Sequence, residues 1–130
     1  MHDILAPKPW KAPKGYSNGI AATGRQVYIA GQIGWDGEQR FVAGGFVEQA
    51  EQALRNIVTI LAEAGGRPEH LVRLTWYVID RGEYIAAGKV LGEAYRRVIG
   101  RHYPTMSAVQ VVALMEDRAR VEIEATAVIP

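Results

Sequence analysis

The sequence predicts an α+β fold in which two helices cover one face of a mixed β-sheet. Two segments repeat apolar side chains at three- and four-residue steps, as amphipathic helices do, and shorter segments around them have the alternating or apolar runs of strands. The predicted order is strand, strand, helix, strand, helix, strand, strand, which supplies a four- to six-stranded sheet. Because 130 residues leave room for one domain, we expect a single domain over 1–130.

The N-terminal part is predicted to be an arm followed by a hairpin. Three prolines alternate with lysines in residues 1–15, and this pattern predicts an extended, weakly structured arm. Strands at 20–23 and 27–30 flank a short connection at 24–26 that contains a glycine. We therefore expect these two strands to pair with each other.

Two helices and three strands are predicted in the rest of the chain. The clearer helix covers 46–64 and is followed by two glycines that stop it. The second covers 83–99, with Gly100 as its stop. The strands are predicted at 71–79, 105–114 and 120–129.

Apolar side chains are predicted on both faces of the sheet. In the third predicted strand, Val72, Leu74 and Trp76 point one way, whereas Tyr77 and Ile79 point the other. The strand after the second helix has the same two-sided pattern. Two helices cover only one face, and a large exposed apolar patch usually marks an interface. We therefore expect a homo-oligomer that packs its sheet faces together.

Composition removes several function classes. Cysteine is absent, which excludes disulfide frameworks, thiolate zinc sites and thiol nucleophiles. Fifteen basic and fourteen acidic residues give a net charge of +1, so we expect no nucleic-acid partner to be recruited by charge alone. The three histidines lack a metal-binding spacing, so no metal is expected. No membrane-spanning or signal segment is recognisable, and a cytoplasmic location is expected.

Two carboxylates near the end of the chain are the most informative chemical groups. Glu122 and Glu124 lie on one face of the predicted terminal strand, with apolar residues on the other face. A solvated strand face is the simpler interpretation. If a neighbouring subunit covers this face, however, a carboxylate there loses solvent and its pKa rises, so that it can act as a general acid and base.

Four segments of the chain carry a resemblance to a known family. They are Gly15-Tyr16-Ser17-Asn18-Gly19, Ala30-Gly31-Gln32-Ile33, Tyr103-Pro104-Thr105-Met106-Ser107-Ala108-Val109 and Val121-Glu122-Ile123-Glu124-Ala125-Thr126-Ala127. In this order they resemble the reactive intermediate deaminases, the Rid or YjgF family, also described as L-PSP-type endoribonucleases. The resemblance covers nearly the whole chain, from Tyr16 to Ile129.

The resemblance implies a chorismate-mutase-like fold and a homotrimer whose sheets form an inner barrel, with ligand clefts between subunits. It also implies hydrolysis of small enamines and imines to 2-oxo acids and ammonia, with no metal or organic cofactor. Glu122 would position or activate the attacking water. The positions that would bind the substrate are Tyr16, Ala30, Gly31, Met106, Ser107 and Lys89.

Three of these positions depart from the family pattern. The motif arginine, which pairs with the substrate carboxylate, is replaced by Met106; Ala30 replaces a common serine, and Lys89 replaces a common asparagine. A thioether cannot form the two charged hydrogen bonds of an arginine, and losing them costs about 2–4 kcal/mol. The standard 2-imino acid reaction is therefore expected to be weak unless Lys89, Arg73 or another cation replaces the arginine.

Three functions remain open from the sequence. The first is a divergent deaminase in which Glu122 directs water onto a C=N carbon and the substrate is anchored in a non-standard way. The second is a non-catalytic trimeric module that binds or senses a small metabolite. The third, an endoribonuclease, is the least favoured, because the sequence lacks a basic, aromatic-lined surface and a histidine pair for phosphoryl chemistry.

Overall fold

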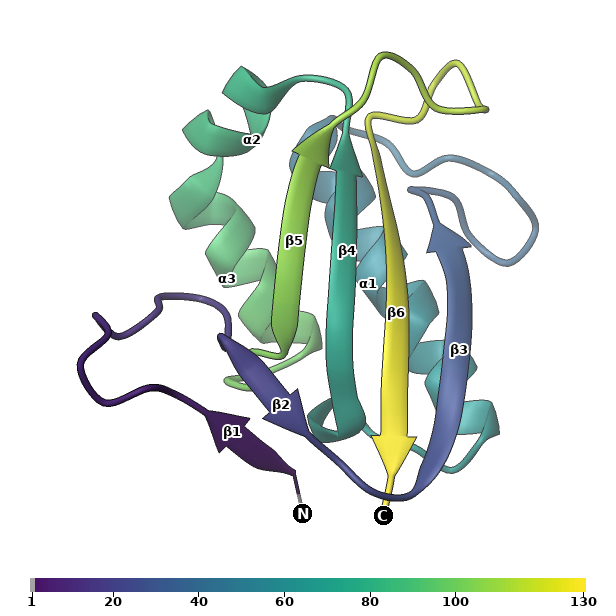
Figure 1. The fold of residues 1–130 in the computed structure, drawn as a ribbon. Coiled ribbons are helices and arrows are strands. Elements are labelled where there is room, and N and C mark those ends of the chain that lie inside the picture. Colours follow the sequence, from purple (N-terminus) through teal and green to yellow (C-terminus); the bar gives the residue numbers. More distant parts are fainter. Residues whose placement is uncertain (1) are drawn as a thin grey trace.

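The structure, a computed structural model, describes residues 2–130. A four-stranded sheet carries α1 and α3 on one face, and a small two-stranded sheet lies at its side (Figure 1). This arrangement confirms the predicted α+β fold with helices on one face of a sheet. The elements are β1 (Asp3–Leu5), β2 (Gly19–Ala21), β3 (Arg25–Gln32), α1 (Phe46–Glu63), a 3₁₀ turn (Pro68–His70), β4 (Leu71–Val78), α2 (Arg81–Ala86), α3 (Gly88–Val98), β5 (Thr105–Gln110) and β6 (Val121–Ile129).

The four-stranded sheet has the order β3-β6-β4-β5. β6 runs antiparallel to both of its neighbours, whereas β4 and β5 are parallel and are joined by the crossover that contains α2 and α3. β6 is therefore held by backbone hydrogen bonds on both sides, which gives the carboxylates that it carries fixed positions. β5 is an edge strand.

The core lies between the sheet and α1. Leu54, Ile57 and Leu61 of α1 are fully buried, as are Leu74 of β4 and Ile123 of β6. These side chains recur at helical steps in α1 and at every second position in the strands, as predicted. Burying each such side chain stabilises the fold by about 1.5–3 kcal/mol, so α1 is the main support of the sheet.

The element boundaries at 46–64, 71–79 and 120–129 are confirmed to within one residue, but the predicted N-terminal hairpin is wrong. β2 pairs with β1, with Ile20 opposite Ile4, and β3 pairs with β6. Part of the expected arm is thus a strand. At Gly24, between β2 and β3, φ is +151°, and a Cβ would lie 2.7 Å from the carbonyl carbon of Ile129, so only glycine fits this close passage.

The predicted second helix consists of two shorter helices. The Asp80 side chain accepts a hydrogen bond of 3.1 Å from the Glu83 backbone N–H and begins α2. The chain then turns at Ala87, and α3 begins at Gly88. The strand predicted over 105–114 is also too long, because β5 ends at Gln110.

The prediction that both faces of the sheet are substantially apolar is wrong. The face away from the helices carries polar side chains along β4 and β6: Arg73, Thr75, Tyr77, Glu122, Glu124 and Thr126. Tyr28 and Val109 are exposed apolar residues on the strands at either edge. A register shift between Leu71 and Arg73 takes Val72 out of the expected alternation.

Candidate active site

The side chain of Glu122 on β6 lies against the backbone of Gly31 on β3. A Cβ placed on Gly31 would lie 2.7 Å from Glu122 Cδ and closer still to Oε2. The absence of a side chain at Gly31 therefore leaves the space that the carboxylate occupies. Two segments of the resemblance, far apart in the sequence, thus meet at one point of the sheet.

An irregularity in β3 creates this contact. Ile29 lies opposite Ala125, but the next pair joins Gln32 to Ile123, so β3 has one residue more than β6 between these pairs. This is a β-bulge, a feature that re-aims side chains and is common beside active sites. Ala30 and Gly31 are the two residues within it, and both are exposed.

Helix α1 fixes the chain on both sides of the contact. Asn56 donates hydrogen bonds to the carbonyl oxygens of Ile33 and Trp35, at 3.4 and 2.7 Å, directly after β3. Gln49, only 5% exposed, donates to the Arg118 carbonyl and accepts from the Arg120 N–H, each at 2.9 Å, directly before β6. Both strands of the contact are therefore tied to the same helix.

Tyr77 on β4 lies directly opposite Glu122. Burial raises the pKa of the Tyr77 hydroxyl above its ordinary value, and the negative charge of Glu124 raises this pKa further. The hydroxyl is therefore protonated at neutral pH and can donate a hydrogen bond. Two carboxylates and a phenol thus share the face of the sheet away from the helices.

Ser107 lies on this face as well, but further from Glu122. It pairs with Thr75 of β4, and Thr75 pairs with Glu124 of β6. Two strand spacings, about 10 Å, therefore separate Ser107 from β6.

Met106 points to the other side of the sheet. It lies opposite the fully buried Leu74 and lines a pocket of about 470 Å³ between the sheet, α2 and α3. Within one protomer, Met106 and Glu122 are therefore on opposite faces of the sheet.

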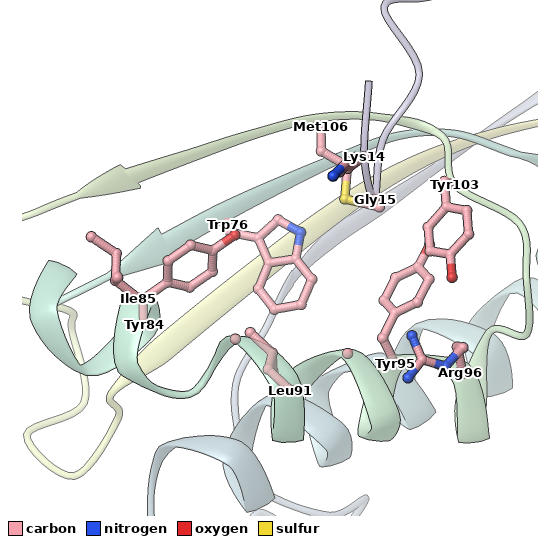
Figure 2. Close-up of a pocket in the computed structure, with 12 residues that line it drawn as sticks. Lys14, Gly15, Trp76, Tyr84, Ile85, Leu91, Tyr95, Arg96, Tyr103 and Met106 are labelled. Carbon is pink, nitrogen blue, oxygen red and sulfur yellow. The ribbon is translucent and has the colours of Figure 1, made fainter. Parts of the chain in front are cut away.

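Four of the twelve residues that line this pocket are aromatic, and their rings are drawn in Figure 2. Tyr95 and Tyr103 are stacked, with ring centroids 5.5 Å apart and an interplanar angle of 12°. Trp76 and Tyr84 meet edge to face at 6.3 Å. The hydroxyl of Tyr95 donates a 2.6 Å hydrogen bond to the His102 carbonyl, which fixes its ring in the wall.

The remaining predicted site residues are dispersed. Tyr16 is 43% exposed and, together with Tyr103, lines a separate hollow that does not include Glu122. Lys89 is exposed on α3 and does not line the pocket. Arg73 shares the face of Glu122 but lies four residues along β4 from Tyr77, about 13 Å away.

The sequence analysis missed two features of the site. The aromatic pocket combines residues from β4, both short helices and the segment before β5, each of which has the spacing of an ordinary core residue. Lys14 and Arg96 are the cations that line this pocket together with Met106, and neither was predicted as a replacement for the motif arginine. Tyr77 was assigned only to an apolar face.

Among residues 2–130, no three histidine, aspartate or glutamate side chains gather as a metal site would require. Over the same residues, no helix combines the length and the apolar character needed to cross a bilayer.

Comparison with known proteins identifies the family. The family model described as Endoribonuclease L-PSP matches residues 6–129, nearly the whole chain. The chain belongs to the Rid/YjgF family. Among relatives of this Rid protein, the 2-iminobutanoate/2-iminopropanoate deaminases of Homo sapiens and Capra hircus are 36% and 40% identical over 105 residues, covering 80% of this chain and 73% of theirs.

The fold of this Rid protein is likewise similar to solved structures of the family. A crystal structure of the Rid-family protein YyfB from Yersinia pestis superposes with a TM-score of 0.86 at 29% identity and covers 98% of both chains. The family assignment and the arrangement of helices on the sheet therefore agree.

Proposed function

We propose that this Rid protein hydrolyses a reactive imine or enamine to a carbonyl compound and ammonia, in a cleft between subunits. The contact between the Glu122 carboxylate and Gly31 carries the proposal, because it places a carboxylate beside exposed backbone where a small ligand can approach. Relatives at 36–40% identity that are named 2-iminobutanoate/2-iminopropanoate deaminases support it.

The reaction needs one group that accepts and returns a proton. Water adds to the carbon of the protonated imine and gives one proton to the Glu122 carboxylate, forming a neutral carbinolamine. The carboxylic acid then returns that proton to the nitrogen, the C–N bond breaks as ammonia leaves, and the Glu122 carboxylate takes the carbinol O–H proton as the C=O bond forms and passes it to the ammonia. The net change is protonated imine plus water to carbonyl compound plus ammonium, and general acid–base catalysis of this kind contributes roughly 10²–10⁴-fold.

The proposal includes a homotrimer whose sheets form an inner barrel. Met106 and Glu122 lie on opposite faces of one sheet, so the two positions can border the same cleft only when they come from different copies. β5 is an edge strand, and beyond the bridge between Ser17 and Thr105 its outer edge is available to a neighbouring copy. A second copy over the face of Glu122 would also remove solvent from its carboxylate, as general acid–base catalysis near neutral pH requires.

The substrate is anchored without the motif arginine. Met106 presents a flexible thioether to an aromatic pocket, so no charged fork is available at that position. Lys89 does not line the pocket of Met106, and Arg73 lies about 13 Å along β4 from Tyr77, the residue opposite Glu122. Lys14 and Arg96, in contrast, both line that pocket. We assign the role of anchoring an anionic group to Lys14 or Arg96.

Ammonia release from imines made in situ by an amino-acid oxidase tests the proposal. The wild-type chain should accelerate release, and Glu122→Gln should abolish the acceleration because it removes the proton acceptor and keeps the size of the side chain. Glu124→Gln, on the same strand face, serves as the matched control. Sedimentation velocity of all three proteins should give one trimeric species. Absence of acceleration with imino acids and neutral imines alike would refute the deaminase function.

A non-catalytic binding function is the second candidate, and the replacement of the motif arginine by Met106 favours it. In that case the pocket would bind a metabolite, and Glu122→Gln would change binding but no rate. The endoribonuclease description of the family supports a third activity only weakly here, because the net charge of +1 gives little attraction for RNA.

A further inference from the structure

The pocket beside Met106 has the size and the walls of a site for a flat ligand. Its volume of about 470 Å³ lies within the usual range for small-molecule sites. The stacked pair of Tyr95 and Tyr103 forms one side, and Trp76 with Tyr84 forms another (Figure 2). Rings of this kind favour planar aromatic partners through stacking and edge-to-face contacts.

One wall of the pocket carries an unused hydrogen-bond donor. Trp76 is 3% exposed, and its indole Nε1 is buried without a hydrogen-bond partner among residues 2–130. Burying an unpaired donor is unfavourable, and a ligand acceptor that reaches it recovers the lost hydrogen bond. Met106, an unbranched and adaptable side chain in the same pocket, can shift to admit such an acceptor. The pocket therefore favours a flat ring system with an acceptor atom.

The charged groups of the pocket are of one sign. Lys14 and Arg96 line it, and none of its lining residues is acidic. A ligand with a negative group beside its ring system would place that group near one of these cations.

We propose that this pocket receives a planar aromatic substituent of the imine, so that aromatic imino acids are preferred over short-chain ones. This inference rests on the proposed function, and Met106 connects the two, because the resemblance places Met106 in the substrate cleft and the structure places it in the aromatic pocket. The substrates in the names of these relatives, 2-iminobutanoate and 2-iminopropanoate, carry short aliphatic chains. The aromatic wall gives this chain a different specificity.

Binding of quinoline and naphthalene tests the pocket without any need for turnover. The two molecules have the same shape, but only quinoline carries an acceptor nitrogen. In the ¹⁵N-labelled full chain, the indole N–H resonance of Trp76, assigned with Trp76→Phe, should move downfield with quinoline. Quinoline should bind about tenfold more tightly than naphthalene, and Trp76→Phe should remove this difference. Trp10→Phe, which changes an exposed tryptophan, is the matched control.

A second variant blocks the pocket without removing a core side chain. Gly88 lines the pocket, and a Cβ there would meet no atom within 4 Å. Gly88→Leu should therefore fold normally, fill part of the pocket and weaken quinoline binding at least about tenfold. Gly88→Ala, which adds a single methyl group, should weaken it much less.

The kinetic comparison uses imines that an amino-acid oxidase makes from phenylalanine and from 2-aminobutyrate. We expect kcat/KM to be at least about tenfold higher for the aromatic imine, and Gly88→Leu to lower this ratio about tenfold. The inference would be overturned by turnover with no aromatic preference, or by quinoline binding that Gly88→Leu leaves unchanged. Neither result would refute the deaminase function. Quinoline binding that Gly88→Leu blocks, without turnover of any imine, would refute the deaminase and retain the aromatic pocket.

Discussion

The two faces of the sheet differ in what they offer a ligand. The face away from the helices holds Glu122 and Tyr77, polar groups that can move or donate a proton. The face toward the helices holds Trp76 and Met106, which form an apolar pocket. Alternation along neighbouring strands therefore puts the proposed catalytic group and the proposed recognition pocket on opposite faces of one chain, and the proposed cleft between copies would bring them together.

The faces also differ in what they contribute to stability. Side chains toward the helices are largely buried in the core, whereas those on the other face are half-buried or exposed. Substitutions on the first face should change folding, and substitutions on the second should change activity. The following predictions test this division, beginning with the largest expected effect.

Leu74 and Thr75 are consecutive residues of β4 that point to opposite faces. Leu74 is fully buried, so Leu74→Ala should lower the free energy of unfolding by about 2–5 kcal/mol through lost contacts and a cavity. Thr75→Ala should lower it by less than about 1 kcal/mol, because Thr75 is only half-buried. Urea unfolding followed by circular dichroism measures both. Equal losses at the two positions would contradict the division between the faces.

Gly31→Ala should reduce activity while leaving the fold intact. The added methyl group overlaps the end of the Glu122 side chain, which is flexible and can turn away. The substitution therefore displaces the carboxylate instead of destabilising the fold. We expect kcat for imine hydrolysis to fall roughly 10- to 100-fold, with a change in unfolding free energy below about 1 kcal/mol. Gly37→Ala, at a site with no atom within 4 Å of the added Cβ, is the control. A Gly31→Ala enzyme of normal activity would show that the carboxylate does not act from this position.

An ion pair links the residue before β6 to helix α2, which lines the aromatic pocket. Arg120, next to β6, donates from Nε to both carboxylate oxygens of Glu83 on α2, at 2.8 and 3.0 Å. Because both side chains are partly exposed, Glu83→Gln should cost only about 1 kcal/mol of unfolding free energy. It should also weaken quinoline binding modestly, since α2 supplies Tyr84 to the pocket. The exposed Arg67–Glu69 pair provides a control, because Glu69→Gln should change neither quantity.

Tyrosines on the two faces should titrate differently. Burial raises the pKa of both Tyr77 and Tyr95, and only at Tyr77 does a neighbouring carboxylate, Glu124, add to the rise. Above the ordinary value of 10.0 the unfolded chain ionises first, so the free energy of unfolding should fall as the pH rises past this value. Glu124→Gln should lower the pKa of Tyr77 and leave that of Tyr95 unchanged. Absorbance titration of the two proteins checks this, and identical curves would contradict the assigned cause.

The sequence predicted those elements whose evidence lies within a single segment. The helix over 46–64 and the strands over 71–79 and 120–129 have strong periodicity, and Glu122 was placed on the correct face by alternation alone. The predicted hairpin was wrong because alternation identifies a strand but not its partner. β2 instead pairs with β1, which precedes the prolines. The prediction of one continuous second helix was wrong because its apolar pattern continues across the turn at Ala87.

The candidate site was predictable only in part, for a similar reason. The resemblance supplied Glu122 and Gly31, and the structure brings these two together. It gave no information on which face Met106 occupies relative to Glu122, since this depends on the register between β4 and its two neighbours. The aromatic pocket draws on β4, α2, α3, β5 and the segments that precede β2 and β5, so no local pattern in the sequence predicts it.

The missing side chain at Gly31 has a consequence for how this protein can fail. In the proposed mechanism, the space that Glu122 fills serves the reaction rather than folding. A substitution of Gly31 by alanine would therefore give a folded chain that chaperones and proteases do not remove. Such a copy would persist at normal abundance and, in a shared assembly, would sit beside working neighbours. Only selection for the proposed reaction, and not the removal of misfolded chains, would then keep glycine at position 31.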